Sequence, residues 1–325
     1  MPGFTTHYIL GLRAYTDLPS GPLKHMISKY RWLYQLGLQG PDMFFYNIPI
    51  LRHRDYRNIG SYMHESHVND FFANALQAIL NLESKQQAQQ AISYIAGFMC
   101  HYVGDYICHP YVYGRIRHNI KSPSAYTYGL HAALENDIDT LLLKKYKKKK
   151  PSQFNQAATI ALNGFEMQFI SDFLAKQINK TYYPITYKNN FQVSPAMVHR
   201  SILALRFGMR TFADPTGKKK NRIGAIEGLF LKNPIVSHKI ISDKVADAVS
   251  CLNLNHESWS NPWDPSLVSN ASFPELFTAS VTKCREIFFI FQEELSQKNL
   301  PHRDFHHLLR ILGNYSYHSG LDVGN

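Results

Sequence analysis

Histidine and carboxylate side chains recur at helical spacing between residues 101 and 135, and such a pattern could hold a metal ion. His101 and Asp105 are four residues apart, and His109 follows after four more. His131 and Glu135 repeat this spacing further along the chain. Positions i and i+4 share one face of a helix, so each set points its side chains in one direction. A single such pair is common on a helix surface, but two pairs from neighbouring helices can build a metal cluster inside a bundle.

The surroundings of Asp105 indicate which cation would suit the site. Asp105 follows an apolar stretch over residues 91–100, and the chain has no Lys or Arg between Lys85 and Arg115. A carboxylate buried there must be paired, hydrogen-bonded or bound to a cation to offset its lost hydration. Imidazole and carboxylate ligands together favour zinc. The four cysteines form no CxxC pair, so we expect free thiols and no closed thiolate site.

Apolar residues at intervals of three and four predict the helices that would carry these side chains. In the first half of the chain these helices cover residues 23–38, 59–82, 85–108 and 126–145, and the third ends before Pro110. In the second half they cover residues 156–179, 195–213, 274–298 and 301–315, with loops predicted at 214–222 and 253–265.

These elements predict an all-α fold, a multi-helix bundle with an additional helical C-terminal half. The polar stretch around Pro151 is a plausible boundary. We therefore predict a zinc-binding catalytic helical domain over residues 1–150 and a helical C-terminal region of unknown role over residues 151–325.

Basic charge is concentrated in one tract. The formal net charge is +11, and six of the 17 Lys and Arg in residues 1–150 fall within residues 144–150. A helix C-terminus favours such lysines, and the tract could also contact an anionic membrane. The distribution does not indicate a broad nucleic-acid-binding face. No signal peptide or transmembrane segment is apparent, so we expect a cytoplasmic location.

Several short motifs occur in an order that resembles the zinc-dependent phospholipase C family of bacteria. They are Thr6-His7-Tyr8, Gly40-Pro41-Asp42, Met63-His64-Glu65, the run from His101 to Asp105, His109, and His131 with Glu135. Each motif alone is weak, but together they are specific, and the resemblance covers about residues 1–145. It implies the helical bundle of that family. Zinc nucleases that act on single strands share the fold and the ligand set, so nucleic acid stays an alternative substrate.

The resemblance implies a metal-binding role for each matching residue. One zinc would be held by Asp42, His64, His101 and Asp105, and a second, with water in its open position, by His109, His131 and Glu135. His7 would bind a third zinc that Asp105 bridges, which makes two to three ions in total. In the family an N-terminal Trp completes this third site. No Trp precedes Trp32 here, and the nitrogen of Pro2 is the remaining candidate if Met1 is removed.

Some positions have rivals. A long loop precedes His131, so His118 competes with His109 as a ligand, and His67 competes with the nearby His64. Asp139 lies four residues beyond Glu135 and could support the cluster, but we expect it to be solvated.

We predict a zinc-dependent hydrolase of phosphate esters, most similar to a phospholipase C-type phosphodiesterase that uses zinc-activated water. Asp42 would serve both as a ligand and as the general base. Phe44, Phe45 and Tyr46 could line a substrate pocket or belong to the core. The alternatives are a non-catalytic zinc-containing helical protein that binds lipid or a partner, and a zinc nuclease. The expected partner is a phosphate-ester substrate, which could be a phospholipid.

Overall fold

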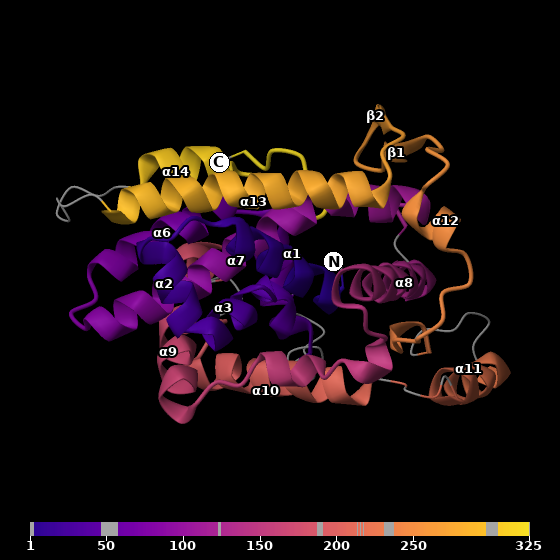
Figure 1. Cartoon of the computed structure of the whole chain (residues 1–325), viewed down its shortest axis with the longest axis horizontal. Coiled ribbons are helices and arrows are strands. Elements are labelled where there is room, and N and C mark those ends of the chain that lie inside the picture. Colours follow the sequence, from indigo (N-terminus) through magenta and orange to yellow (C-terminus); the bar gives the residue numbers. More distant parts are fainter. Residues whose placement is uncertain are drawn as a thin grey trace.

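A long buried helix, α7 (Lys85–Arg115), lies at the centre of the fold. The computed structural model describes residues 3–46, 58–122, 125–186, 191–212, 214, 216, 218–230, 237–296 and 305–324. In these residues the protein is a multi-helix bundle with one small two-stranded sheet (Figure 1). The all-α class predicted from the sequence is therefore confirmed.

The helices around α7 come from both ends of the chain. Those packed directly on it include α1 (Phe4–Asp17), α2 (Pro22–Lys29), α3 (Arg31–Gly37), α6 (Val68–Leu80) and α13 (Phe273–Ser296). Two short elements precede α6, namely η1 (Gly40–Tyr46) and α5 (Ile59–Glu65), and α8 (Ala125–Lys147) follows α7. The remaining elements are η2 (Pro151–Gln153), η3 (Gln156–Thr159), α9 (Gly164–Thr186), α10 (Pro195–Thr211), α11 (Lys218–Phe230), η5 (Ser237–Lys239), α12 (Ala248–Leu252), β1 (Trp259–Asn261), β2 (Asp264–Ser269) and α14 (His306–Leu312).

A close crossing of α3 and α7 fixes the position of the central helix. Gly37 and Gly97 face each other there, and a Cβ added to either would lie 2.1 Å from a backbone oxygen of the facing helix. Only glycine allows two backbones to approach so closely. The crossing brings the end of α3 against His101, whose Nδ1 lies 3.2 Å from the carbonyl oxygen of Leu38.

The predicted end of the central helix is wrong. The sequence places it before Pro110, whereas α7 continues through Pro110 to Arg115. Proline removes an intrahelical donor and usually ends a helix. Here the next turn is held by tertiary contacts, because Tyr111 and Val112 are buried and the Tyr111 hydroxyl donates to the carbonyl of Cys251 at 2.7 Å. His109 therefore lies on a continuous helix with Asp105.

Two predicted helices are each broken in the structure. Residues 23–38 form α2 and α3, which meet at Tyr30. Residues 59–82 form α5 and α6, and His67 between them has a left-handed backbone conformation with φ 51°. For residues 4–17, which form α1, the sequence analysis predicts no helix.

In the second half, the helices predicted over 195–213 and 274–298 correspond closely to α10 and α13 in the described residues. Helix α9 begins at Gly164, later than predicted. Part of the predicted loop 214–222 belongs to α11, where the carboxylate of Asp214 accepts the N–H of Lys220 at 2.8 Å. Part of the predicted loop 253–265 forms an antiparallel hairpin in which Trp259 pairs with Ser269. Residues 301–304 of the last predicted helix lie outside the described residues.

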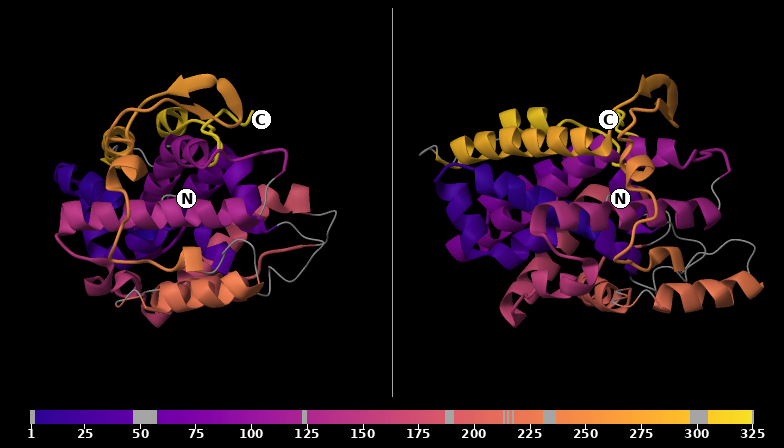
Figure 2. Two further views of the ribbon diagram at one scale, coloured as in Figure 1. Left: turned by 90° about the vertical axis from the view of Figure 1, so that its right-hand side faces the viewer. Right: turned by 45° about the vertical axis from the view of Figure 1, so that its right-hand side comes forward.

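Helices from both halves share one hydrophobic core. Helices α13 and α14 cover one side of the bundle, and α9 and α10 lie on the opposite side (Figures 1 and 2). The division at residue 150 stays a prediction about domain organisation. The four cysteines are buried and free, as expected. Within the described residues, no helix combines the length and apolar character that crossing a membrane requires.

Candidate metal centre

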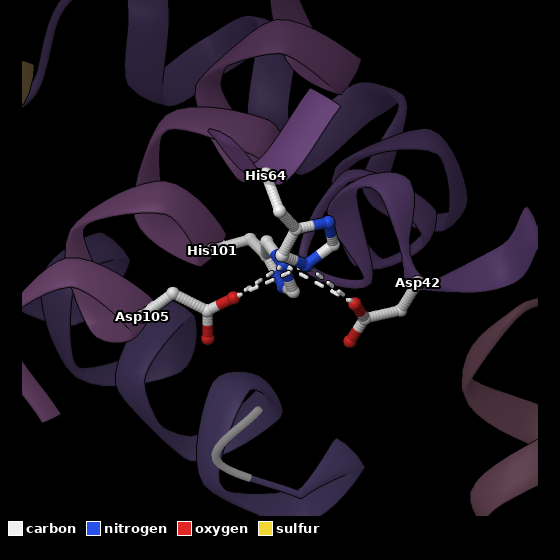
Figure 3. A group of neighbouring side chains, drawn as sticks. All are labelled: Asp42, His64, His101 and Asp105. Atoms are coloured by element: carbon white, nitrogen blue, oxygen red, sulfur yellow. Dashed lines mark ion pairs between the residues drawn. The ribbon is translucent and has the colours of Figure 1, made fainter. Parts of the chain in front are cut away.

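Four side chains from three elements meet at the first candidate metal site, called here the Asp42 group. Element η1 contributes Asp42, α5 contributes His64, and α7 contributes His101 and Asp105 (Figure 3). One ligand atom from each lies within 4.8 Å of the others. His64 Nε2 is 3.2 Å from Asp42 Oδ1, and His101 Nε2 is 3.2 Å from Asp105 Oδ2. The four-residue spacing on α7 thus places His101 and Asp105 on one face.

A second site, called here the His109 group, adjoins the first. It joins His109 on α7 to His131 and Glu135 on α8, again with ligand atoms within 4.8 Å of one another. Glu135 Oε1 lies 2.7 Å from His131 Nε2 and 3.6 Å from His109 Nε2. Asp105 Oδ2 lies 3.9 Å from His109 Nδ1, so the two groups are neighbours.

Backbone carbonyls orient three of the histidine rings. The Nδ1 atoms of His64, His101 and His109 lie 2.6, 3.2 and 2.6 Å from the carbonyl oxygens of Gly60, Leu38 and Tyr317. A carbonyl can only accept a hydrogen bond, so each Nδ1 carries the ring proton and Nε2 presents a lone pair. Metal-binding histidines are held in this way by acceptors behind the ring.

A glycine lets η1 approach α7 closely enough to deliver Asp42. Gly40 has φ +47°, and a Cβ there would lie 2.1 Å from the imidazole of His101. Both the left-handed conformation and the close approach require glycine. This gives a physical reason for glycine in the Gly40-Pro41-Asp42 motif.

His7 lies beside the Asp42 group on α1. Its Nε2 is 3.0 Å from Asp105 Oδ1, and its ring stacks on His101 with a centroid distance of 4.1 Å. The start of α1 is held by Asp139, which accepts the N–H of Thr5 and both the N–H and the hydroxyl of Thr6. Asp139 is only 1% exposed, so the expectation of a solvated carboxylate is wrong.

Burial and neighbouring charges shift the titration of these side chains. Burial by itself raises the pKa of Asp105, but the charges of His101 and His109 outweigh it and hold that pKa well below its ordinary value. Burial raises the pKa of Glu135 well above its usual range. Burial also lowers the pKa of His131 well below the usual range of a histidine. A cation would offset the desolvation of the buried carboxylate and bind the neutral rings.

The donor atoms fit a zinc site. In the described part of the chain, Nε2 of His64, His101 and His109 and both carboxylate oxygens of Asp105 are buried and make no hydrogen bond. Leaving a buried polar atom unpaired costs about 1–3 kcal/mol. A cluster of such atoms in one place therefore indicates a ligand. Imidazole nitrogen and carboxylate oxygen are the donors of zinc sites that keep an open position.

A comparison with protein families shows which family the chain belongs to. The family described as zinc dependent phospholipase C matches residues 6–183. The chain belongs to the zinc-dependent phospholipase C family. The matched span contains every predicted side-chain ligand and extends past residue 145, where the sequence resemblance ends. Comparisons with curated proteins and with solved structures found no match.

The two rival histidines lie outside both groups of this phospholipase C family member. His67 Nδ1 is 2.8 Å from Asp70 Oδ2, and its side chain is 37% exposed. The ring of His118 packs against Tyr113 and Trp263 at centroid distances of 4.9 and 5.9 Å. The structure therefore brings His64 and His109 into the candidate sites, not their rivals.

The aromatic residues after Asp42 have separate surroundings. Phe44 is fully buried in the core. Phe45 lies against the ring of His64 at 5.3 Å, and Tyr46 lies under Gly208 of α10. Phe45 is thus the one of the three in ring contact with a residue of the Asp42 group.

The end of the chain, outside the matched family span, contacts both groups. Tyr317 donates its N–H to the carbonyl of His64 at 2.9 Å, and its own carbonyl accepts from His109. The ring of His318 stacks on His64 at 5.0 Å, and His318 Nδ1 lies 3.1 Å from the Tyr113 hydroxyl. The sequence analysis assigns no role to these residues. The contact between His109 and Tyr317 spans 208 residues, and no local spacing signals it.

Proposed function

We propose that this protein is a zinc-dependent phosphodiesterase that hydrolyses phospholipids in the manner of a phospholipase C. The observation that carries the proposal is that the Asp42 group and the His109 group adjoin at Asp105. Two adjoining cations can stabilise both the attacking and the leaving oxygen of a phosphate ester. A zinc site kept for structure alone would instead use one closed set of ligands.

We assign one zinc ion to the Asp42 group and one to the His109 group. A third would lie between His7 and Asp105; the chain start, which the resemblance implies for that site, falls in residues outside the described ones. When bound, zinc lowers the pKa of a coordinated water to about 7 and stabilises negative charge on phosphate oxygens. The three rings held by backbone carbonyls have their Nε2 lone pairs free and would hold the ions with them.

Asp42 is the residue that we propose as general base. It is 4% exposed, and its Oδ1 faces His64 Nε2. As the water oxygen forms its bond to phosphorus, Asp42 takes up the proton that the water loses. The bond between phosphorus and the glycerol oxygen breaks, and that oxygen takes the proton back from Asp42 and leaves as diacylglycerol, which returns Asp42 to a carboxylate. Burial of the carboxylate orients it and keeps bulk water from competing.

The first experiment measures zinc content and turnover in one preparation. Protein purified without chelators should contain two to three zinc ions per chain and release diacylglycerol from phosphatidylcholine. Asp42→Asn, assayed at saturating zinc, should lower turnover by about 10²–10⁴-fold, the usual contribution of a general base. Asp70→Asn is the matched control, because that carboxylate is 60% exposed and pairs with His67 outside both groups.

Three results would contradict the proposal. One is a chain that stays free of zinc after reconstitution, and another is an Asp42→Asn variant as active as the Asp70→Asn control. The third is cleavage of single-stranded DNA without any cleavage of phospholipid, which would make the protein a zinc nuclease.

A further inference from the structure

Two helices beyond the matched family span expose large apolar side chains. On α10, Leu203 is 46% and Phe207 is 69% exposed; on α11, Ile226 is 58% and Leu229 is 78% exposed. Single apolar residues on a surface need no explanation, but clustered ones mark sites of interaction. The residues that flank these four decide which kind of partner they suit.

On α10 the exposed stripe is apolar in the middle and basic at both ends. Arg200, Leu203, Phe207 and Arg210 are all exposed and follow one another at intervals of three and four residues, so they share one face of the helix. The opposite face is apolar and buried in the core. Helix α10 is therefore apolar toward the protein, and toward solvent it is apolar with a basic border.

Helix α11 also combines exposed basic and apolar residues, with the basic ones at one end only. Lys218, Arg222, Ile226 and Leu229 are exposed and fall on one face, with the basic residues one and two turns before the apolar ones. The sequences of α10 and α11 contain one acidic residue, Glu227. It is 8% exposed and accepts the N–H of Ser237 at 2.8 Å, so it does not neutralise the outer face.

The two helices lie on the same side of the molecule, and α10 lies close to the candidate metal centre. Both run along the side opposite α13 (Figures 1 and 2). The inner face of α10 packs on η1, the element that carries Asp42. At this contact a Cβ on Gly208 would lie 2.6 Å from the ring of Tyr46. The exposed stripe thus lies on the outer face of α10, and the inner face of the same helix packs on the element that carries Asp42.

We propose that the α10–α11 face, meaning the exposed apolar residues of these helices with their flanking Arg and Lys, docks the protein on an anionic lipid bilayer. Large apolar side chains with a basic border insert at the boundary between headgroups and acyl chains. The Arg and Lys side chains extend toward lipid phosphates and add attraction to anionic headgroups. The lysine tract at 144–150, the membrane contact predicted from the sequence, is a charge tract without these exposed apolar residues.

Flotation with lipid vesicles tests the proposal independently of catalysis. Binding of the zinc-loaded full-length protein is measured to vesicles of phosphatidylcholine with phosphatidylserine, and to vesicles of phosphatidylcholine alone. Turnover of a monomeric short-chain phospholipid is measured in parallel. We expect binding to the anionic vesicles that weakens as salt is added, because salt screens the basic residues.

Two surface variants and one control locate the contact. Phe207→Ser with Leu229→Ser should weaken vesicle binding at least about tenfold, since each large apolar side chain removed from water contributes on that order. Arg210→Glu with Arg222→Glu should abolish the preference for phosphatidylserine. Phe289→Ser is the matched control, because Phe289 is 50% exposed on α13, on the opposite side. All three should leave turnover of the monomeric substrate unchanged.

Several outcomes would overturn the proposal. They are wild-type protein that does not bind anionic vesicles, Phe207→Ser with Leu229→Ser binding as tightly as wild type, or Phe289→Ser weakening binding equally. If the wild type ignores vesicles but forms an oligomer that the Phe207 and Leu229 substitutions dissociate, the face is a protein interface instead. If the wild-type protein binds anionic vesicles but hydrolyses no phospholipid, the result would refute the proposed enzyme activity but not this docking surface.

Discussion

Replacing Asp139 by Ala should destabilise the start of α1 and loosen the position of His7. The Asp139 carboxylate accepts three hydrogen bonds, from Thr5 N at 2.9 Å, Thr6 N at 2.8 Å and Thr6 Oγ1 at 2.7 Å. The two N–H groups belong to the first turn of a helix and have no intrahelical partner. Loss of a buried partner costs about 1–3 kcal/mol per group, so we expect a loss of about 3–5 kcal/mol with some relaxation.

Urea unfolding measures this loss. Asp137→Ala is the control, because Asp137 is half-buried on the same helix, two residues away. Asp139→Asn should fall between the wild type and Asp139→Ala, since an amide oxygen can still accept from the first turn of α1. Zinc titration supplies a second readout: if α1 positions His7 for an ion, His7→Ala should lower zinc affinity in the wild type and change little in the Asp139→Ala background.

A loss below about 1 kcal/mol for Asp139→Ala would refute this reasoning, because it would equal an ordinary exposed helix cap. An equal loss in Asp137→Ala would show that the effect belongs to α8 as a whole. Full additivity of Asp139→Ala and His7→Ala in the zinc titration would show that the cap does not act on the metal centre.

The other predictions concern the metal ions, the ligand choice, the chain end and pH. Removing zinc with a chelator should lower the free energy of unfolding by about 4 kcal/mol relative to zinc at about 1,000 times its Kd, and an unchanged denaturation midpoint would contradict this. His64→Ala should reduce zinc content measured by mass spectrometry, whereas His67→Ala should leave it unchanged. Asn261→Ala removes a 2.8 Å bond to the chain end that carries the Tyr317 carbonyl, and should weaken zinc binding about tenfold or more in a competition titration. Burial raises the pKa of Asp139 from 3.8 to about 6, so the folded chain holds this proton more tightly than the unfolded chain. Its contribution to stability should therefore fall as pH rises from about 4 to 6, a decline that urea titrations of Asp139→Asn should lack.

Helical periodicity predicted the long elements well and their interruptions poorly. Helices α8, α10 and α13 lie close to the predicted ranges, and a proline marks the start of α10 and of α13. The breaks at Tyr30 and His67 carry no Gly or Pro, so no local residue type announces them. The opposite error occurs at Pro110, where a residue that usually ends a helix is overridden by buried contacts in the next turn. In each case tertiary packing decides against the local signal.

The candidate ligands could be predicted in two different ways. The i, i+4 spacing alone brings together His101 with Asp105 and His131 with Glu135, since each pair shares a helix. His7, Asp42 and His64 come from three other elements, and only the order of family motifs relates them to the site. That order holds no information about distance, which is why His67 remained a rival for His64 until the fold was known.

Residue types do not reveal the groups that orient the candidate ligands. These groups explain why His64, and not His67, lies in the Asp42 group. The acceptors behind the rings of His64 and His109 are backbone carbonyls, which every residue possesses. His64 sits in the last turn of α5, where its Nδ1 reaches the carbonyl four residues earlier and its own carbonyl receives the N–H of Tyr317. His67 occupies the left-handed break with φ 51°, and its ring turns instead to the exposed carboxylate of Asp70. A ligand position therefore depends on the backbone around a histidine as much as on the histidine, and a chain end 200 or so residues away can supply part of that backbone.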